Sequence, residues 1–221
     1  MKKAFLWLCA VLMGATAAFN LLGGLGTTCV ALFAERFGER MAALVPYKPL
    51  YWLFVAAGVA TAAWEAYAVS GIMRRTPAAL RQCALSLAAG ALAAGAQAFA
   101  STALRGSGAP SDMRLYLTLA TLVLVALAGA AGVFGRSGDD ETSPDEPGDG
   151  RAATGAALIA GGALALAAPA LVRSTHVLAG VDYSVAFGIV LPAAGAAAVL
   201  AGAGFTALSH LGYSPRRMNG R

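Results

Sequence analysis

The chain has 221 residues, of which 58% are hydrophobic and only 12% are charged, whereas soluble domains carry about 25% charged residues. Too few charges remain to cover a soluble globule, so the composition excludes a soluble fold, a disordered chain and a nucleic-acid-binding module. The net charge of +5 has a topological explanation, because loops that stay in the cytoplasm collect Lys and Arg. We therefore expect an all-α integral membrane protein that has the lipid bilayer as its surroundings and no nucleic-acid partner.

Six stretches are apolar over the length of about 20 residues that a membrane span needs. Of the sixteen Lys and Arg, ten fall on the side of the N-terminus and six on the other, Arg114 being counted with the outer loops. This asymmetry predicts a multi-pass protein of the plasma (inner) membrane with both termini in the cytoplasm. The predicted spans cover residues 4–34, 50–72, 82–104, 115–135, 152–172 and 183–209.

The N-terminus has a second interpretation. Lys2 and Lys3, the apolar run that follows and the small residues up to Ala17 are also typical of a cleavable signal peptide over residues 1–17. Because the apolar run continues to Ala34, an uncleaved first span is favoured.

The segment 136–151 separates two groups of predicted spans. It holds six acidic residues, two arginines, two prolines and three glycines, and such a composition cannot offset the entropy lost on ordering. A calcium site is disfavoured because the D-x-D-x-D-G spacing is absent. We expect a four-span unit over 1–135, an acidic disordered linker over 136–151, and a two-span hairpin with a short basic tail over 152–221.

Two further features concern helix shape. Apolar residues at Phe37, Met41 and Leu44 recur at helical spacing, which predicts either an amphipathic surface helix over 35–45 or a helical extension of the first span. Pro192 falls in the middle of the sixth predicted span and is expected to kink it. Small residues four apart favour close helix contacts in lipid, and they occur at Ala128/Gly132, Ala157/Gly161 and Ala198/Gly202.

Glu65 is the only formal charge inside a predicted span. An unpaired carboxylate there costs about 2.5 kcal/mol or more, so it needs compensation. Counting along the helix places Glu65 in the inner third, where protonation, pairing with Arg74 or Arg75, or a polar cavity would compensate it. A structural role is the favoured interpretation. The alternatives are a proton or cation site and a contact with a partner.

Two amides and a glycine-rich string complete the candidate site. Asn20 and Gln97 are expected at matched depth in the outer third, where amides on separate helices hydrogen-bond to each other or line the entrance of a small-molecule pocket. The string from Asn20 to Cys29 contains Gly23, Gly24 and Gly26, which permit close packing or a helix break that lines a cavity.

Catalytic and metal-binding patterns are missing from the sequence. His176 and His210 are predicted on opposite sides of the membrane, and the three cysteines are widely spaced, so no metal site and no cofactor are expected. No H-E-x-x-H or G-x-S-x-G string occurs, and we do not expect an enzyme.

Short loops, Ala- and Gly-rich helix faces and a separable hairpin predict a non-catalytic accessory or scaffold subunit of a larger plasma-membrane assembly, with other membrane subunits as partners. The alternative is a small proton- or cation-coupled transporter or channel that uses Glu65. A membrane enzyme that acts on lipid is a third, weaker alternative.

Overall fold

The structure is a computed structural model that describes residues 2–134, 147–178, 181–182 and 189–211. Helices dominate these residues, and the strands β1 (Val177–Leu178) and β2 (Val181–Asp182) form one short antiparallel pair. The long helices are α1 (Lys2–Phe33), α3 (Lys48–Met73), α4 (Ala79–Arg105), α5 (Ser111–Ala130), α6 (Pro147–His176) and α8 (Val190–Leu211).

Four of these helices are long and apolar enough to cross a membrane, namely those over Ala4–Arg36, Val45–Met73, Ala79–Arg105 and Ser111–Ala130. Shorter apolar stretches lie within α6 and α8, at Gly155–Ala170 and Pro192–Leu208. The predicted all-α membrane architecture, with a group of four helices followed by two more, is confirmed.

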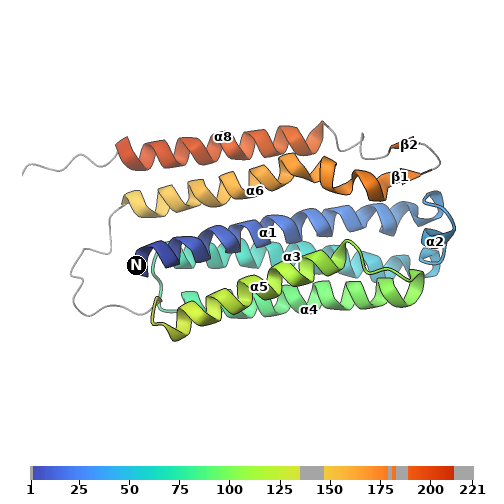
Figure 1. Cartoon of the computed structure of the whole chain (residues 1–221), viewed down its shortest axis with the longest axis horizontal. Helices are drawn as coiled ribbons and strands as arrows, with labels where there is room; N and C mark the ends of the chain where they lie inside the picture. The colour runs from blue at the N-terminus through green and yellow to red at the C-terminus, as the bar shows by residue number, and fades with distance from the viewer. Residues whose placement is uncertain (1, 135–146, 179–180, 183–188, 212–221) are drawn as a thin grey trace, which may run out of the picture.

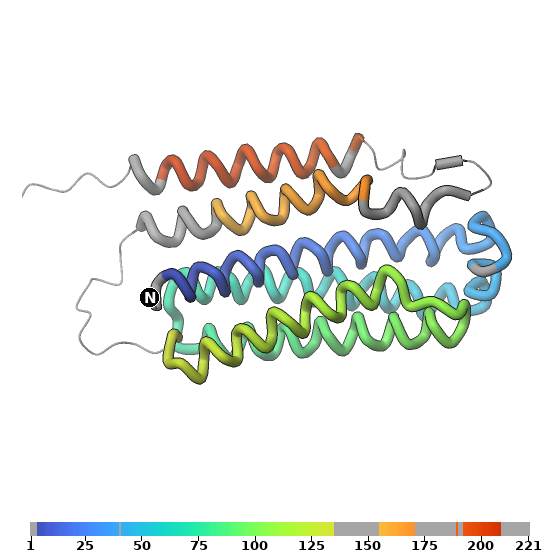
Figure 2. The backbone as a smooth tube through the Cα atoms, viewed as in Figure 1, coloured from blue at the N-terminus to red at the C-terminus, as the bar shows by residue number. Residues whose placement is uncertain are grey.

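The four spanning helices form a closed bundle. Helix α1 packs on α3 and α5, and α4 packs on the same two helices from the other side. Helix α6 lies along α1 outside the bundle, and α8 lies along α6 as the outermost helix (Figure 1; Figure 2). The two C-terminal helices therefore pack against the four-helix bundle of their own chain, α6 directly and α8 through α6.

Apolar side chains fill both ends of the bundle. One cluster lies where α3 passes to α4 and includes Cys9, Met13, Ile72, Cys83 and Leu87. The other lies at the opposite end, around Leu44, Tyr51 and Phe54. The polar residues of the candidate site lie between these two clusters.

The connection between α1 and α3 differs from both expectations. It consists of three short pieces, η1 (Ala34–Arg36), α2 (Glu39–Ala42) and η2 (Val45–Tyr47). Gly38 has φ of 76°, a conformation that favours glycine and interrupts a continuous helix. The completely buried Leu44 then seals the end of the bundle.

The C-terminal helices also correct one expectation. Pro192 lies in the first turn of α8, where a proline is tolerated because the backbone N–H has no intrahelical acceptor. It therefore does not kink the middle of this helix. Pro169 is the proline inside α6. The segment 135–146, which holds most of the expected acidic linker, lies outside the described residues, and α6 begins at Pro147.

Candidate functional site

Glu65 lies completely buried inside the bundle, with an exposed fraction of 0%. The side-chain Nδ2 of Asn20 on α1 donates to both carboxylate oxygens, at 2.9 and 3.0 Å. Arg74 and Arg75, which the sequence offered as counter-charges, lie exposed beyond the end of α3. The burial of the Glu65 carboxylate is therefore compensated by hydrogen bonds from an amide on the neighbouring helix and not by these two arginines.

Arg114 is the functional residue that the sequence analysis missed. It was counted with the outer loops, but its side chain turns into the bundle from the first turn of α5 and is only 3% exposed. Its Nε donates to Oδ1 of Asn20 at 3.3 Å, and its Nη1 donates to Oε1 of Gln97 at 2.9 Å. The sequence did contain one indication, because Arg114 lies only three residues after the start of an apolar helix. A side chain at such a position can reach the helix bundle, but a count of loop charges does not consider this.

Asn20 bridges the two buried charges. Its NH2 group faces the Glu65 carboxylate and its carbonyl oxygen faces the Arg114 guanidinium, so the amide dipole is aligned with the field between them. Within the described residues the only ion pair joins Lys48 to Glu35, and Glu65 and Arg114 are therefore connected through Asn20 rather than directly.

Gln97 extends the network toward the α2 end of the bundle. Its Nε2 donates to Oγ1 of Thr27 at 2.8 Å, and that hydroxyl donates to the carbonyl oxygen of Gly23 at 2.7 Å. Asn20 and Gln97 do come together, as expected, but Arg114 lies between them and bonds to both. The predicted direct amide pair is thus replaced by a bridge through a cation.

Hydroxyl groups add further links between the same helices. Thr118 Oγ1 donates to the carbonyl oxygen of Arg114 at 2.8 Å and lies 3.4 Å from Asn20 Nδ2. The hydroxyls of Thr16 and Thr121 are paired at 2.8 Å between α1 and α5. Nearer the α2 end, Tyr51 and Ser101 pair at the same distance between α3 and α4. All four helices of the bundle contribute to this polar interior.

Glycines on three helices make room for the charged side chains. A Cβ on Gly23 would collide with the Arg114 side chain. A Cβ on Gly58 would lie 3.2 Å from Arg114 Nη2, and one on Gly90 would lie 2.6 Å from Glu65 Oε1. Helix α1 runs through Gly23, Gly24 and Gly26 without interruption, so the helix break considered for this string does not occur. Gly24 instead packs against the backbone of Gly58.

The network is complete in hydrogen-bonding terms. Among the described residues, no buried side-chain nitrogen or oxygen lacks a hydrogen-bond partner. Buried polar groups carry a large penalty when unpaired and rigidify a structure when paired. The geometry therefore suits a polar core that fixes the relative positions of four apolar helices.

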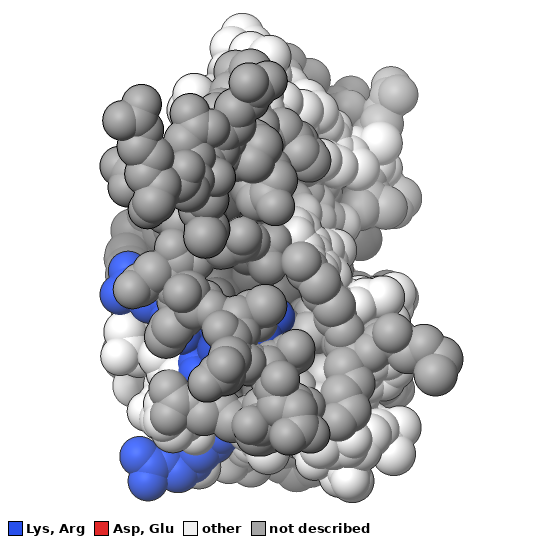
Figure 3. Space-filling model, turned by 90° about the vertical axis from the view of Figure 1, so that its left-hand side faces the viewer, with Lys and Arg blue, Asp and Glu red and all other residues white. Residues whose placement is uncertain are grey.

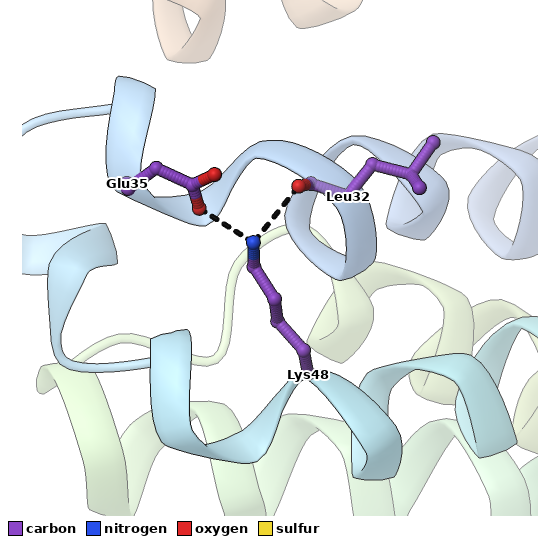
Figure 4. A network of polar contacts seen from close by, with 3 residues as sticks. All are labelled: Leu32, Glu35 and Lys48. Carbon is purple, nitrogen blue, oxygen red and sulfur yellow. Dashed lines mark hydrogen bonds and ion pairs between the residues drawn. The ribbon is translucent and has the colours of Figure 1, made fainter.

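A second polar contact lies at the exposed end of the bundle. Lys48 Nζ, at the start of α3, donates to the carbonyl oxygen of Leu32 at 2.9 Å and forms an ion pair with Glu35 Oε2 at 2.6 Å (Figure 4). Leu32 supplies one of the last carbonyls of α1, which has no partner within the helix. Because Glu35 is 52% exposed, this contact ties α1 to α3 but has the small energetic weight of a surface pair.

The described residues contain no group of three His, Cys, Asp or Glu side chains that could hold a metal ion. His176 ends α6, and His210 lies in the last turn of the antiparallel α8. Comparisons with protein-family models, with curated proteins and with solved structures give no match for this chain.

Proposed function

We propose that the protein is a non-catalytic accessory or scaffold subunit of a larger membrane assembly. The observation that supports this most directly is the closed network around Arg114, in which the buried polar groups of four helices satisfy one another. A bundle fixed in this way offers a rigid platform, and its outer surface remains available for other subunits.

The position of α8 supports the choice of its outer side as the surface that would meet a partner. This helix packs mainly on α6 and lies farthest from the bundle (Figure 1). Its free side carries Leu200, Phe205 and Leu208, which are 72%, 41% and 55% exposed. In a bilayer such a surface contacts either lipid acyl chains or a helix of another subunit. We propose that it contacts a helix of another subunit.

A site-specific photo-crosslinker at Leu200 tests this proposal in native membranes. We expect an adduct of one defined higher mass, and the matched control is the same group at Leu92 on α4, which is 75% exposed. Lipid adducts alone at both positions would contradict the subunit proposal. Removal of residues 152–221 should then lower the yield of the co-purifying complex.

A small proton- or cation-coupled transporter is the second candidate. It is favoured by the presence of a buried carboxylate and a buried guanidinium inside the spans, where ionisable residues often mark ion pathways. The Glu65→Gln variant separates the two functions in proteoliposomes of the full chain. A scaffold predicts no proton or cation flux with either protein. Flux that the folded variant loses would establish the transporter and refute the scaffold.

We further propose that the protein lies in the plasma (inner) membrane with both termini in the cytoplasm. Because Arg114 belongs to the bundle interior, only five Lys and Arg remain on the outer side against ten on the inner side, which strengthens the asymmetry. Labelling of a cysteine introduced at Ser143 tests the orientation. An impermeant reagent added from outside should leave it unlabelled, and strong labelling would reverse the topology.

A further inference from the structure

An exposed cluster of arginines lies at the end of the bundle where α3 passes to α4. Arg74 and Arg75 follow α3, and Arg81 lies in the first turn of α4. All three are exposed, and within the described residues none of them takes part in a hydrogen bond of its side chain or an ion pair. The sequence between Glu65 and Asp112 contains no acidic residue. Figure 3 shows Lys and Arg atoms at several places on this face.

The backbone at Arg75 shows that an arginine is not the residue that the turn itself prefers. Its φ is 47°, which is the left-handed region that favours glycine. The N–H of Arg75 donates to the Ile72 carbonyl at 3.1 Å, and that of Thr76 donates to the Gly71 carbonyl at 3.0 Å. These two bonds define the C-terminal helix cap whose left-handed position is usually occupied by glycine.

Arg81 is also placed against the preference of its helix. The first turn of a helix favours acidic side chains, because unpaired backbone N–H groups give that end a partial positive charge. The first turn of α4 contains no acidic residue and carries Arg81 instead. Two of the three arginines are thus unfavourable for local structure, and no described residue pairs with their charges, so the cluster suits an anionic partner from outside the described residues.

We propose that Arg74, Arg75 and Arg81 bind the phosphate headgroup of an anionic lipid in the surrounding bilayer. The cluster lies at the end of two spanning helices, which is the level of the lipid phosphates, and basic residues at this level attract anionic headgroups. Arginine is well suited to this contact because its planar guanidinium binds phosphate oxygens in pairs. This inference is independent of the proposed subunit function.

Trp64 provides a local reporter. Its Nε1 donates to Oε1 of Gln82 at 2.8 Å, and Gln82 is the direct neighbour of Arg81. The other two tryptophans are Trp7 and Trp52, and the full chain with both changed to Phe therefore reports from this site alone. Quenching by dibrominated phosphatidylglycerol and by dibrominated phosphatidylcholine, each diluted into unbrominated phosphatidylcholine vesicles, gives the relative affinity for the two lipids.

We expect phosphatidylglycerol to associate at least roughly five-fold more strongly, which is the preference that one arginine near an anionic surface provides. The triple variant Arg74→Gln, Arg75→Gln, Arg81→Gln should reduce the ratio to about one. Arg36→Gln is the matched control, because this exposed arginine lies at the opposite end of the bundle over the Phe33 ring, and it should leave the ratio unchanged.

The Arg75→Gly variant distinguishes loss of lipid binding from loss of folding. Glycine adopts the left-handed conformation without strain, so this variant should melt at the same temperature as the parent or higher while the lipid ratio falls. A ratio that stays unchanged in folded Arg75→Gly and in the triple variant would overturn the proposal.

Three other outcomes would also overturn it. Equal quenching by the two lipids in the parent protein would show that the cluster has no lipid preference. Loss of the preference in inorganic phosphate, but not in chloride of the same ionic strength, would indicate a site for free phosphate. A preference that emerges only after the six acids of 136–151 are replaced by Ser and Gly would assign the cluster to the chain's own acidic segment.

Discussion

In the bundle of α1, α3, α4 and α5, side chains from four helices meet in one hydrogen-bonded network, whereas α6 and α8 come together through glycine backbone. A Cβ on Gly162 would lie 2.6 Å from the Gly195 carbonyl oxygen, and one on Gly202 would lie 2.5 Å from that of Gly155. The two glycines of each helix are seven residues apart, so they recur on the same face. Helix α6 uses a different face for α1, where Ala157 packs on Gly14 and Gly161 packs on Ala18.

This comparison separates two ways of assembling helices in lipid. Small residues let backbones approach and gain dispersion contacts, with no hydrophobic effect between helices. Two buried opposite charges that are linked by hydrogen bonds instead impose one arrangement, because a displacement that breaks these bonds leaves a buried charge without compensation at high cost. A substitution at a glycine contact should therefore lower the free energy of unfolding less than the loss of one buried charge in the bundle.

The largest effect is expected from Arg114→Met. The substitution removes the counter-charge of Glu65 and leaves the carbonyl oxygens of Asn20 and Gln97 without their donor, which should cost about 3–5 kcal/mol of unfolding free energy. Addition of Glu65→Gln should recover part of this loss, because no lone charge then remains buried. Denaturation of the single and double variants in mixed micelles measures the coupling, and strictly additive effects would contradict the bridge through Asn20.

Gly23→Ala should have the next largest effect. Its Cβ would collide with the Arg114 side chain, and displacement of that side chain should cost about 1–3 kcal/mol. Gly26→Ala in the same helix is the matched control, since its Cβ would have no neighbour within 4 Å, and it should be neutral or slightly stabilising. Equal losses in both variants would show that Gly23 does not serve the network.

A smaller and more local effect is expected from Gly162→Ala. The added methyl group would press on the backbone of α8 and should cost about 1–2 kcal/mol. Because the contact between Gly162 and α8 lies outside the four-helix bundle, amide hydrogen exchange should accelerate in α6 and α8 and stay unchanged in α3 and α4. Gly204→Ala, whose Cβ would meet nothing within 4 Å, should leave exchange in every helix as it is.

The smallest effect on the bundle is expected from removal of residues 152–221. The network draws on α1, α3, α4 and α5 alone, so residues 1–135 should insert and melt within a few degrees of the full chain. Thermal unfolding in the same mild detergent checks this. A large drop would mean that the α1 face around Gly14 needs α6 to stay folded.

Three residues of the candidate site could be predicted from the sequence, because polar residues inside a membrane span are rare and energetically unfavourable. Glu65, Asn20 and Gln97 stand out in any apolar span, and the structure brings them into one network. The predicted depth of Glu65 relative to the two amides is wrong, because counting residues from the predicted ends of separate spans does not determine how the helices are shifted along one another. Glu65 is predicted in the inner third and Asn20 in the outer third of the membrane, yet the two side chains are in hydrogen-bond contact.

Composition and hydropathy by themselves determined that this chain is a helical membrane protein with six apolar segments, four before and two after an acidic stretch, because the length and polarity of each segment are local properties. The structure adds that, within the described residues, only the first four of these helices are long and apolar enough to span a membrane. Only the tertiary structure decided that the Arg114 side chain lies inside the bundle and bonds to Asn20 and Gln97. A long side chain at a helix end can reach water or the core, and the choice depends on the space that Gly23 and Gly58 leave on two other helices. The continuity of α1 was decided in the same way, since Gly23 makes room for Arg114 and Gly24 packs on the backbone of α3, and neither interrupts the helix.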